Sequence, residues 1–134
     1  MVSLEEVGRL AAAMPGVTEE DRRGNRSWNV AGKCFLWERP FSKADIKRFG
    51  DVAPPSGPII AVAVQDLGEK EAMLAEQHRG FFTISHFDGY AAVLIQLDAV
   101  LKRPLREAII DAWLACAPRG LGDEYLRTTK KRSR

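Results

Sequence analysis

A run of six apolar residues at positions 59–64, Ile-Ile-Ala-Val-Ala-Val, most constrains what this chain can fold into. Its β-branched side chains favour an extended strand, and both alternating sets of side chains are apolar, which is typical of a strand with neighbours on both sides. With 134 residues, 46% of them hydrophobic, the chain is long enough to bury the core that such a strand needs. The run therefore predicts the central strand of a sheet in one globular domain.

Hydrophobic periodicity and turn signals predict the other elements. Ser3 and Ser42 are suited to cap helices, and the dipeptides Ala31-Gly32 and Asp88-Gly89 are suited to hairpin turns. In chain order we expect helix 3–14, strands 25–30 and 33–39, a helical turn at 42–49, strand 59–64, helix 69–78, strands 81–85 and 90–97, and helix 104–117.

This element order predicts an α+β fold, in which an antiparallel sheet of about five strands has the terminal helices packed on one face. The other face is expected to be open. Within strand 33–39, the period of two predicts that Phe35 and Trp37 share one face while Cys34 and Leu36 share the other. Residues 1–129 are expected to form the single domain, and residues 130–134 a basic tail.

Charge is unevenly distributed along the chain. The net charge is only +2, but the tail, Lys130-Lys131-Arg132-Ser133-Arg134, carries four cations, and residues 22–48 carry eight basic against two acidic residues. Aromatic residues interleave with these cations at Trp28, Phe35, Trp37 and Phe41. Cations that neutralise phosphates beside planar side chains that stack are typical of nucleic-acid surfaces.

These features favour a non-enzymatic protein that binds DNA with weak sequence selectivity. The predicted contact residues are Arg22, Arg23, Arg26, Trp28, Lys33, Trp37, Lys43, Lys47 and Arg48. The alternative is a small-molecule or protein-interaction module that uses the open sheet face around Trp28, Phe35 and Trp37. Aromatics on alternating strands are also common core residues, with Lys and Arg at the edges, so exposure of the basic side chains on one face separates these interpretations.

The sequence carries no convincing catalytic, cofactor or metal motif. Ser85, His86 and Asp88 are nearly consecutive on a predicted turn and would point apart, and the chain has only two histidines. Cys34 and Cys116 lie far apart and are predicted to be reduced thiols. A targeting signal and an apolar run long enough for a membrane span are both lacking. We therefore expect a cytoplasmic protein with no membrane partner, and favour a monomer.

Four segments resemble the MmcQ/YjbR family of small bacterial proteins, which are described as DNA-binding. They are residues 13–19 (Ala-Met-Pro-Gly-Val-Thr-Glu), 27–35 (Ser-Trp-Asn-Val-Ala-Gly-Lys-Cys-Phe), 81–90 (Phe-Phe-Thr-Ile-Ser-His-Phe-Asp-Gly-Tyr) and the pair Ala112-Trp113. The resemblance covers about residues 3–129. It implies a CyaY-like fold, similar in architecture to frataxin, whose two β-wings form a "double wing" that contacts DNA.

The residues that match the family's pattern lie in the two predicted hairpins. They are Ser27, Trp28, Val30, Gly32, Lys33 and Phe35 in the first, and His86, Gly89 and Tyr90 in the second. The chain departs from the pattern in a longer stretch at 50–58, in Cys34 and in its basic tail. A frataxin-like iron role is not implied, because the first predicted helix has only Glu5 and Glu6 rather than an acidic ridge.

Overall fold

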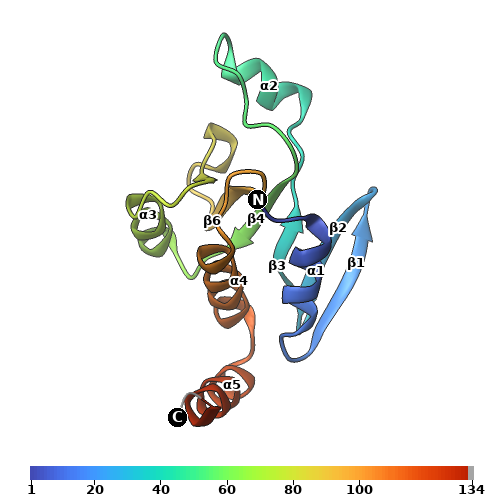
Figure 1. The fold of residues 1–134 in the computed structure, drawn as a ribbon, viewed down its shortest axis with the longest axis vertical. Coiled ribbons are helices and arrows are strands. Elements are labelled where there is room, and N and C mark those ends of the chain that lie inside the picture. The colour runs from blue at the N-terminus through green and yellow to red at the C-terminus, as the bar shows by residue number, and fades with distance from the viewer. Residues whose placement is uncertain (133–134) are drawn as a thin grey trace.

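A computed structural model describes the backbone of residues 1–132 and the side chains of residues 1–129. Within them, six strands form one antiparallel sheet in the order β1-β2-β3-β4-β6-β5 (Figure 1). The strands are β1 (Val17–Arg22), β2 (Asn25–Val30), β3 (Lys33–Glu38), β4 (Ile59–Ala63), β5 (Phe81–Phe82) and β6 (Ala92–Gln96). The helices are α1 (Leu4–Ala12), α2 (Lys43–Phe49), α3 (Leu67–Ala75), α4 (Lys102–Cys116) and α5 (Arg119–Arg132), with a short 3-10 helix, η1 (Ser85–Phe87). The predicted α+β class is confirmed, with one strand more than expected.

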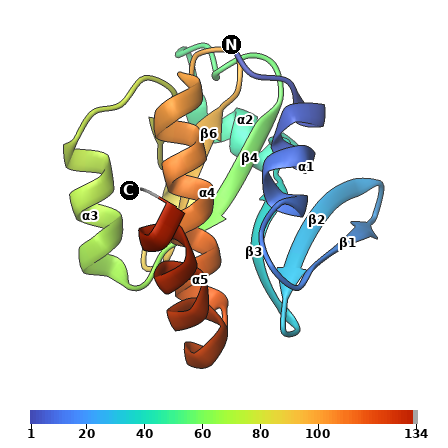
Figure 2. The ribbon, with the colours of Figure 1, turned by 60° about the horizontal axis from the view of Figure 1, so that its bottom comes forward.

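Helices α1 and α4 pack on one face of the sheet (Figure 2). The main core lies between them and the strands, and Val7 of α1 and Ile109 of α4 meet Ile60 of β4 there. Met14 and Trp113, which the helical spacing assigns to the core, are buried. The indole Nε1 of Trp113 donates to the carbonyl of Pro15 at 3.0 Å, which joins α4 to the end of the first helix.

Strand β4 is central, as its composition predicts. It pairs with β3 on one side and β6 on the other. Its alternate residues enter two different clusters: Ile60 and Val62 face the helices, whereas Ile59 and Ala61 join a smaller cluster on the opposite face. The sheet therefore has apolar cover on both sides at β4, and the face away from α1 and α4 is not entirely open.

Strand β1 was not predicted. Its sequence, Val-Thr-Glu-Glu-Asp-Arg, has low strand propensity and is exposed after its first residue. It is nevertheless paired with β2 along its whole length, from Val17↔Val30 to Arg22↔Asn25. Because β1 is the edge of the sheet, its charged side chains need no cover and discourage pairing with another chain. The acidic residues Glu19, Glu20 and Asp21, which lie outside every predicted element, thus belong to an edge strand.

A β-bulge corrects the predicted faces of β3. Trp28 lies opposite Leu36, but Asn29 lies opposite Cys34, so Phe35 is an extra residue in the ladder. The bulge turns both Phe35 and Leu36 toward the helix-side core, where each is fully buried. The prediction that Phe35 and Trp37 share a face is therefore wrong.

The predicted hairpin at 81–97 is also different. Strands β5 and β6 do pair, with Phe81↔Ile95 and Phe82↔Leu94, but residues 83–91 form η1 and turns rather than a tight connection at Asp88-Gly89. Phe87 is the physical reason, because its ring turns inward and is 5% exposed in the smaller cluster with Leu94. Burial of this ring competes successfully with the local turn signal.

Helix α5, Arg119–Arg132, crosses the predicted boundary between domain and tail. Its backbone is helical through Arg132, while the side chains of 130–132 and the whole of 133–134 lie outside the described residues. The side chains of the predicted basic tail, residues 130–134, therefore all lie outside the described residues. Among the residues that are described, no helix has the length and apolar character needed to cross a membrane.

Candidate binding cleft

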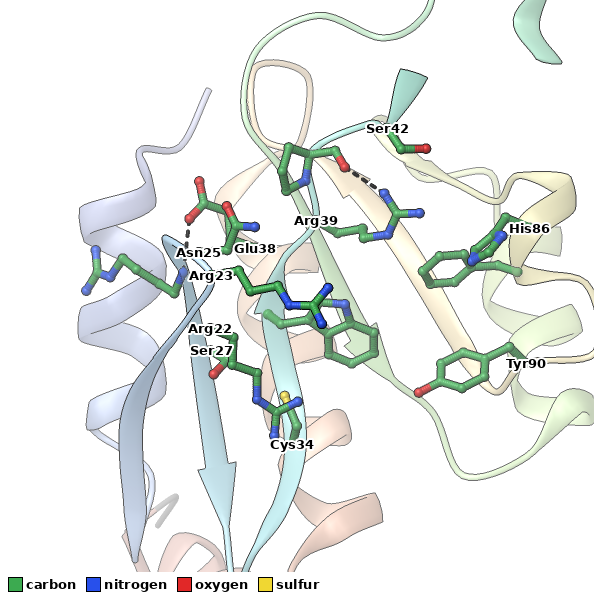
Figure 3. A pocket seen from close by; sticks show the side chains of 14 residues that line it. Arg22, Arg23, Asn25, Ser27, Cys34, Glu38, Arg39, Ser42, His86 and Tyr90 are labelled. Atoms are coloured by element: carbon green, nitrogen blue, oxygen red, sulfur yellow. Dashed lines mark hydrogen bonds between the residues drawn. The ribbon is translucent and has the colours of Figure 1, made fainter. Parts of the chain in front are cut away.

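A cleft of about 640 Å³ lies on the face of the sheet away from α1 and α4. Side chains from β2 and β3 form one side, and the segment from His86 to Tyr90 forms the other (Figure 3). This volume lies within the range of small-molecule sites in proteins. Residues distant in sequence, such as Arg22, Trp37 and Tyr90, meet at this one place.

The cleft exists because only half of this sheet face is covered. Over β4 and β6, the apolar side chains of Ala61 and Leu94 are buried beneath Phe87. Over β1 and β2 the strand alternation instead places polar side chains on this face, among them the exposed Glu20 and the buried Ser27, which lines the floor of the cleft. The boundary between the covered and the bare half runs along β3, where Trp37 is half-buried.

The turn between β1 and β2 presents two arginines to the cleft. Arg23 and Gly24 form a two-residue loop with φ of 55° and 86°, which fits a type I′ hairpin turn. The Gly24 amide donates to Asp21 Oδ1 at 2.8 Å and fixes the loop. Arg22 and Arg23 are exposed, and neither has an ion pair within residues 1–129. The left-handed region is less favourable for arginine than for glycine or asparagine, so Arg23 occupies a conformation that costs some stability.

Arg39 enters the cleft from the end of β3 and is held in place by Asp45. Its Nη1 donates to Asp45 Oδ2 at 2.9 Å and to the Pro40 carbonyl at 2.6 Å, and its guanidinium carbon lies 5.4 Å from the centre of the Phe87 ring. In Figure 3 the Arg23 and Arg39 side chains both reach into the space before His86 and Tyr90. Arg39 is therefore the third cation of the cleft and the most rigidly held.

Asp45 is a buried carboxylate whose environment favours its charged form. Burial alone would raise its pKa, but the backbone amide of Ser42 at 2.9 Å and the guanidinium of Arg39 outweigh burial and hold the pKa below its ordinary value. Ser42 Oγ in turn accepts from the Asp45 amide at 3.1 Å, the reciprocal capping box of α2. This network fixes the start of α2 next to the cleft, and Ser42 itself lines it.

Aromatic side chains line the cleft beside these cations. Trp37 and Tyr90 meet edge to face, with ring centres 6.4 Å apart, and Tyr90 meets Phe87 in the same way at 5.6 Å. Tyr90 is 55% exposed, which is high for such a large side chain. A planar ligand could contact Trp37 and Tyr90 without any change in the covered half of the sheet.

Other polar groups complete the lining. Glu38 Oε1 accepts from the Arg26 backbone amide at 3.1 Å, so one carboxylate lies at the edge of the cleft. Burial raises the pKa of the Cys34 thiol, whose Sγ lies 3.5 Å from the Leu36 carbonyl. Cys34 is therefore a protonated thiol at neutral pH rather than an activated nucleophile.

Arg26 and Trp28 do not serve the predicted interface. Arg26 binds Glu19 through two nitrogens, at 2.9 and 3.0 Å, and Glu5 of α1 at 3.3 Å, while its guanidinium lies 5.1 Å from the centre of the Trp28 ring. The hydrogen bonds that Arg26 donates to Glu19 lower the pKa of Glu19 and raise the pKa of Arg26. Trp28 is 1% exposed and donates to Glu19 Oε1 at 2.9 Å. Both predictions are corrected: Arg26 is neutralised, and Trp28 has no free face for a base.

The remaining predicted cations lie in two other places. Lys33 follows the Ala31-Gly32 turn, at the opposite end of the β2–β3 hairpin from Arg22 and Arg23, and its charge partly offsets the burial that raises the pKa of Cys116 at the end of α4. Lys43, Lys47 and Arg48 are on α2, where Arg48 Nη1 lies 3.4 Å from Asp45 Oδ1. The nine predicted residues therefore do not form one surface.

Arg22, Arg23, Arg26 and Trp37 are the predicted site residues that line the cleft, although the guanidinium of Arg26 is paired with Glu19 and Glu5. Arg39, Phe87 and Tyr90 join them but were not among the predicted contact residues. Arg39 was counted in the basic region, and Tyr90 was marked by the family resemblance, so weak signals existed for both. No feature of the sequence predicted that Phe87 belongs to the site, because its position depends on burial against β6.

Within the described residues, no group of three or more His, Cys, Asp or Glu side chains could hold a metal ion. His78 is occupied locally, since its Nε2 lies 2.8 Å from Glu76 Oε2. The polar groups of the cleft are mainly guanidinium donors, which suit an anionic or hydrogen-bond-accepting ligand rather than a cation.

Comparison with known proteins finds close relatives in mycobacteria. The uncharacterized proteins Rv2570 of Mycobacterium tuberculosis (strain H37Rv) and Mb2600 of Mycobacterium bovis are each 39% identical to this chain over 129 residues, which is 94% of this chain and 97% of the relative. The chain belongs to the family of these mycobacterial proteins. No protein-family model and no solved structure matches it. The relationship spans both sides of the cleft, but the names of the mycobacterial family members state no ligand.

Proposed function

We propose that this protein is a binding module whose cleft takes a ligand that carries a phosphate or carboxylate beside a planar ring. The observation that carries the proposal is the convergence of the guanidinium groups of Arg22 and Arg23, which have no ion pair within residues 1–129, with the Trp37–Tyr90 pair. Arg39 lies beside them, but its charge is paired with that of Asp45. Guanidinium groups bind such anions through paired hydrogen bonds, and exposed aromatic faces stack on rings. A nucleotide combines both features, either free or within a single strand of nucleic acid.

Isothermal titration calorimetry with adenosine monophosphate tests this proposal. Adenosine and inorganic phosphate, titrated separately, probe the ring-bearing part and the anionic part of that ligand. The monophosphate is expected to bind at least tenfold more tightly than adenosine or phosphate, because the cations and the aromatic pair each contact one part of it. A single-stranded oligonucleotide tests whether the ligand is part of a polymer. Absence of saturable binding by all of these probes at millimolar concentration would contradict the proposal.

Matched variants localise the binding. The double variant Arg22→Gln, Arg23→Gln should weaken monophosphate binding by at least tenfold, because both cleft cations that lack ion pairs are removed. Lys33→Gln removes a cation at the other end of the β2–β3 hairpin and should change the affinity by less than threefold. Equal loss in both variants would mean that net charge, and not the cleft, governs binding.

Duplex DNA is a second candidate, in keeping with the resemblance to the MmcQ/YjbR family. Lys43 and Lys47 are exposed on α2, which begins beside the cleft, and within residues 1–129 they have no ion pair. A duplex that reached both α2 and the β1–β2 turn would meet four cations, these two lysines together with Arg22 and Arg23. Four phosphate contacts predict a log–log salt slope of about −3.6 for binding to a duplex. A slope near zero, or no binding at low salt, would exclude this candidate.

A further inference from the structure

Lys70 is a buried cation behind the wall of the cleft. It lies on α3 and is 7% exposed, and its Nζ donates to the carbonyls of Phe87 at 2.6 Å and of Tyr90 at 2.9 Å. Burial lowers the pKa of the ammonium, and the charge of Asp88 opposes that shift. Within residues 1–129 no carboxylate forms an ion pair with it.

A buried ammonium whose hydrogen-bond partners are both neutral carbonyls is unfavourable for the free energy of folding. Removal of an ammonium from water is costly unless several strong hydrogen bonds compensate, and a well-packed apolar side chain often stabilises such a position as well or better. Lys70 is therefore better explained by what its hydrogen bonds hold. Both acceptors belong to the short segment 87–90, so the ammonium joins the two ends of that segment from behind.

The segment that Lys70 holds carries the aromatic wall of the cleft. Its own backbone bonds are all local: the amides of Phe87, Asp88 and Tyr90 donate to carbonyls three residues earlier in the chain, and the Tyr90 carbonyl accepts from the Ala92 amide at 2.8 Å. None of these bonds connects the segment to α3. Two of its side chains contact residues that line the cleft: Tyr90 meets Trp37, and Phe87 lies beneath the guanidinium of Arg39. The ammonium of Lys70 thus links α3 to the backbone of the two residues whose rings line the cleft.

We propose that Lys70 is a positioning residue, which fixes the segment 87–90 so that Phe87 and Tyr90 stand at the correct place opposite Trp37 and Arg39 for ligand binding. The proposal rests on the proposed function for its ligand. It predicts that loss of the ammonium loosens this segment and weakens binding, although Lys70 contacts no ligand. It also predicts that the two carbonyls, each left with one local backbone amide as its only donor, make this segment one of the first parts of the domain to open.

Hydrogen exchange on Lys70→Met, which keeps the length of the side chain and removes its donors, tests the positioning role. The amides of residues 87–92 should exchange at least tenfold faster than in the wild-type protein, while those of β4, in the centre of the sheet, change by less than threefold. Lys102→Met, at an exposed lysine of α4, is the matched control and should leave both unchanged. Unchanged exchange at 87–92, or an equal increase throughout the sheet, would overturn the proposal.

Binding of adenosine monophosphate separates this proposal from the proposed function. A folded Lys70→Met variant should bind at least fivefold more weakly, and Lys70→Arg, which retains charge and donors, should recover part of the loss. Unchanged affinity in Lys70→Met would refute the role of Lys70 alone. No binding by the wild-type protein, with accelerated exchange in Lys70→Met, would refute the proposed function alone. Should Lys70→Met fail to fold, Lys70→Arg with wild-type exchange but altered affinity would also overturn the positioning role.

Discussion

The two halves of the sheet face opposite α1 and α4 are built differently. Over β4 and β6 the side chains are small or aliphatic, and Phe87 covers them, so that Leu94 is fully buried. Over β1 and β2 the same face carries Glu20, which is exposed, and Ser27, which is buried and donates its hydroxyl to the Glu20 carbonyl at 3.2 Å. One half thus contributes to the free energy of folding, and the other is left available for contact. The cleft forms where the two halves meet.

The largest expected effect comes from the covered half. Leu94→Ala should lower the free energy of unfolding by about 2–5 kcal/mol, since it removes buried methyl groups and leaves a cavity. Urea denaturation measures this loss. On the bare half, Glu20→Gln should change the same quantity by less than about 0.5 kcal/mol, because the side chain is exposed. Similar losses in both variants would show that the two halves do not differ in this way.

Asp45, on α2 next to the cleft, should have an intermediate effect on the free energy of unfolding. Asp45→Asn weakens the bonds to Arg39 and to the Ser42 amide and is expected to cost about 1–3 kcal/mol at pH 7. Because the folded pKa lies below the ordinary value, the carboxylate stabilises the fold above the unfolded pKa, and this contribution is lost as the pH falls through the folded pKa.

Urea denaturation of the wild-type protein and of Asp45→Asn at pH 7 and pH 3 checks this sign. The difference between the two proteins should be largest at pH 7 and should shrink in acid, as the wild-type carboxyl takes up its proton. A difference that grows on acidification would contradict the assigned direction of the pKa shift.

A smaller effect of opposite sign is expected at the turn of the bare half. Arg23→Asn should raise the free energy of unfolding by about 0.5–1 kcal/mol, because asparagine tolerates the left-handed conformation better than arginine does. The same change should weaken monophosphate binding by removing a cleft cation. Thermal denaturation and titration of one variant measure both effects. Loss of stability at Arg23→Asn would mean that the arginine is retained for folding, not for binding.

The fold was predictable where local signals and long-range pairing agree. The apolar run of β4, the Ala31-Gly32 turn and the capping box of Ser42 each specify their element through neighbouring residues, and these predictions are confirmed. Strand β1 was missed because its pairing with β2, rather than its own composition, makes it a strand. The bulge at Phe35 was missed because a shift in register leaves no mark on the alternation of residue types.

The candidate site was less predictable than the fold, since charge along a sequence does not reveal which charges are paired. Arg26 and Arg23 are equivalent by composition, yet Arg26 meets Glu19 and Glu5 on the helix side whereas Arg23 faces the cleft. The partner from α1 lies 21 residues away, so only the tertiary structure separates the two arginines. Tyr90 likewise reaches Trp37 only through the path of residues 83–91.

The indole N–H signals of the three tryptophans, followed by ¹H–¹⁵N correlation spectroscopy during titration with adenosine monophosphate, test the central claim most directly. Trp37 lines the cleft, whereas the indole nitrogens of Trp28 and Trp113 are bonded to Glu19 and to the Pro15 carbonyl on the helix side. The account predicts a saturable shift of the Trp37 signal with the other two unchanged. A Trp37 signal that stays in place at saturating ligand, or one that moves no more than that of Trp113, would contradict it.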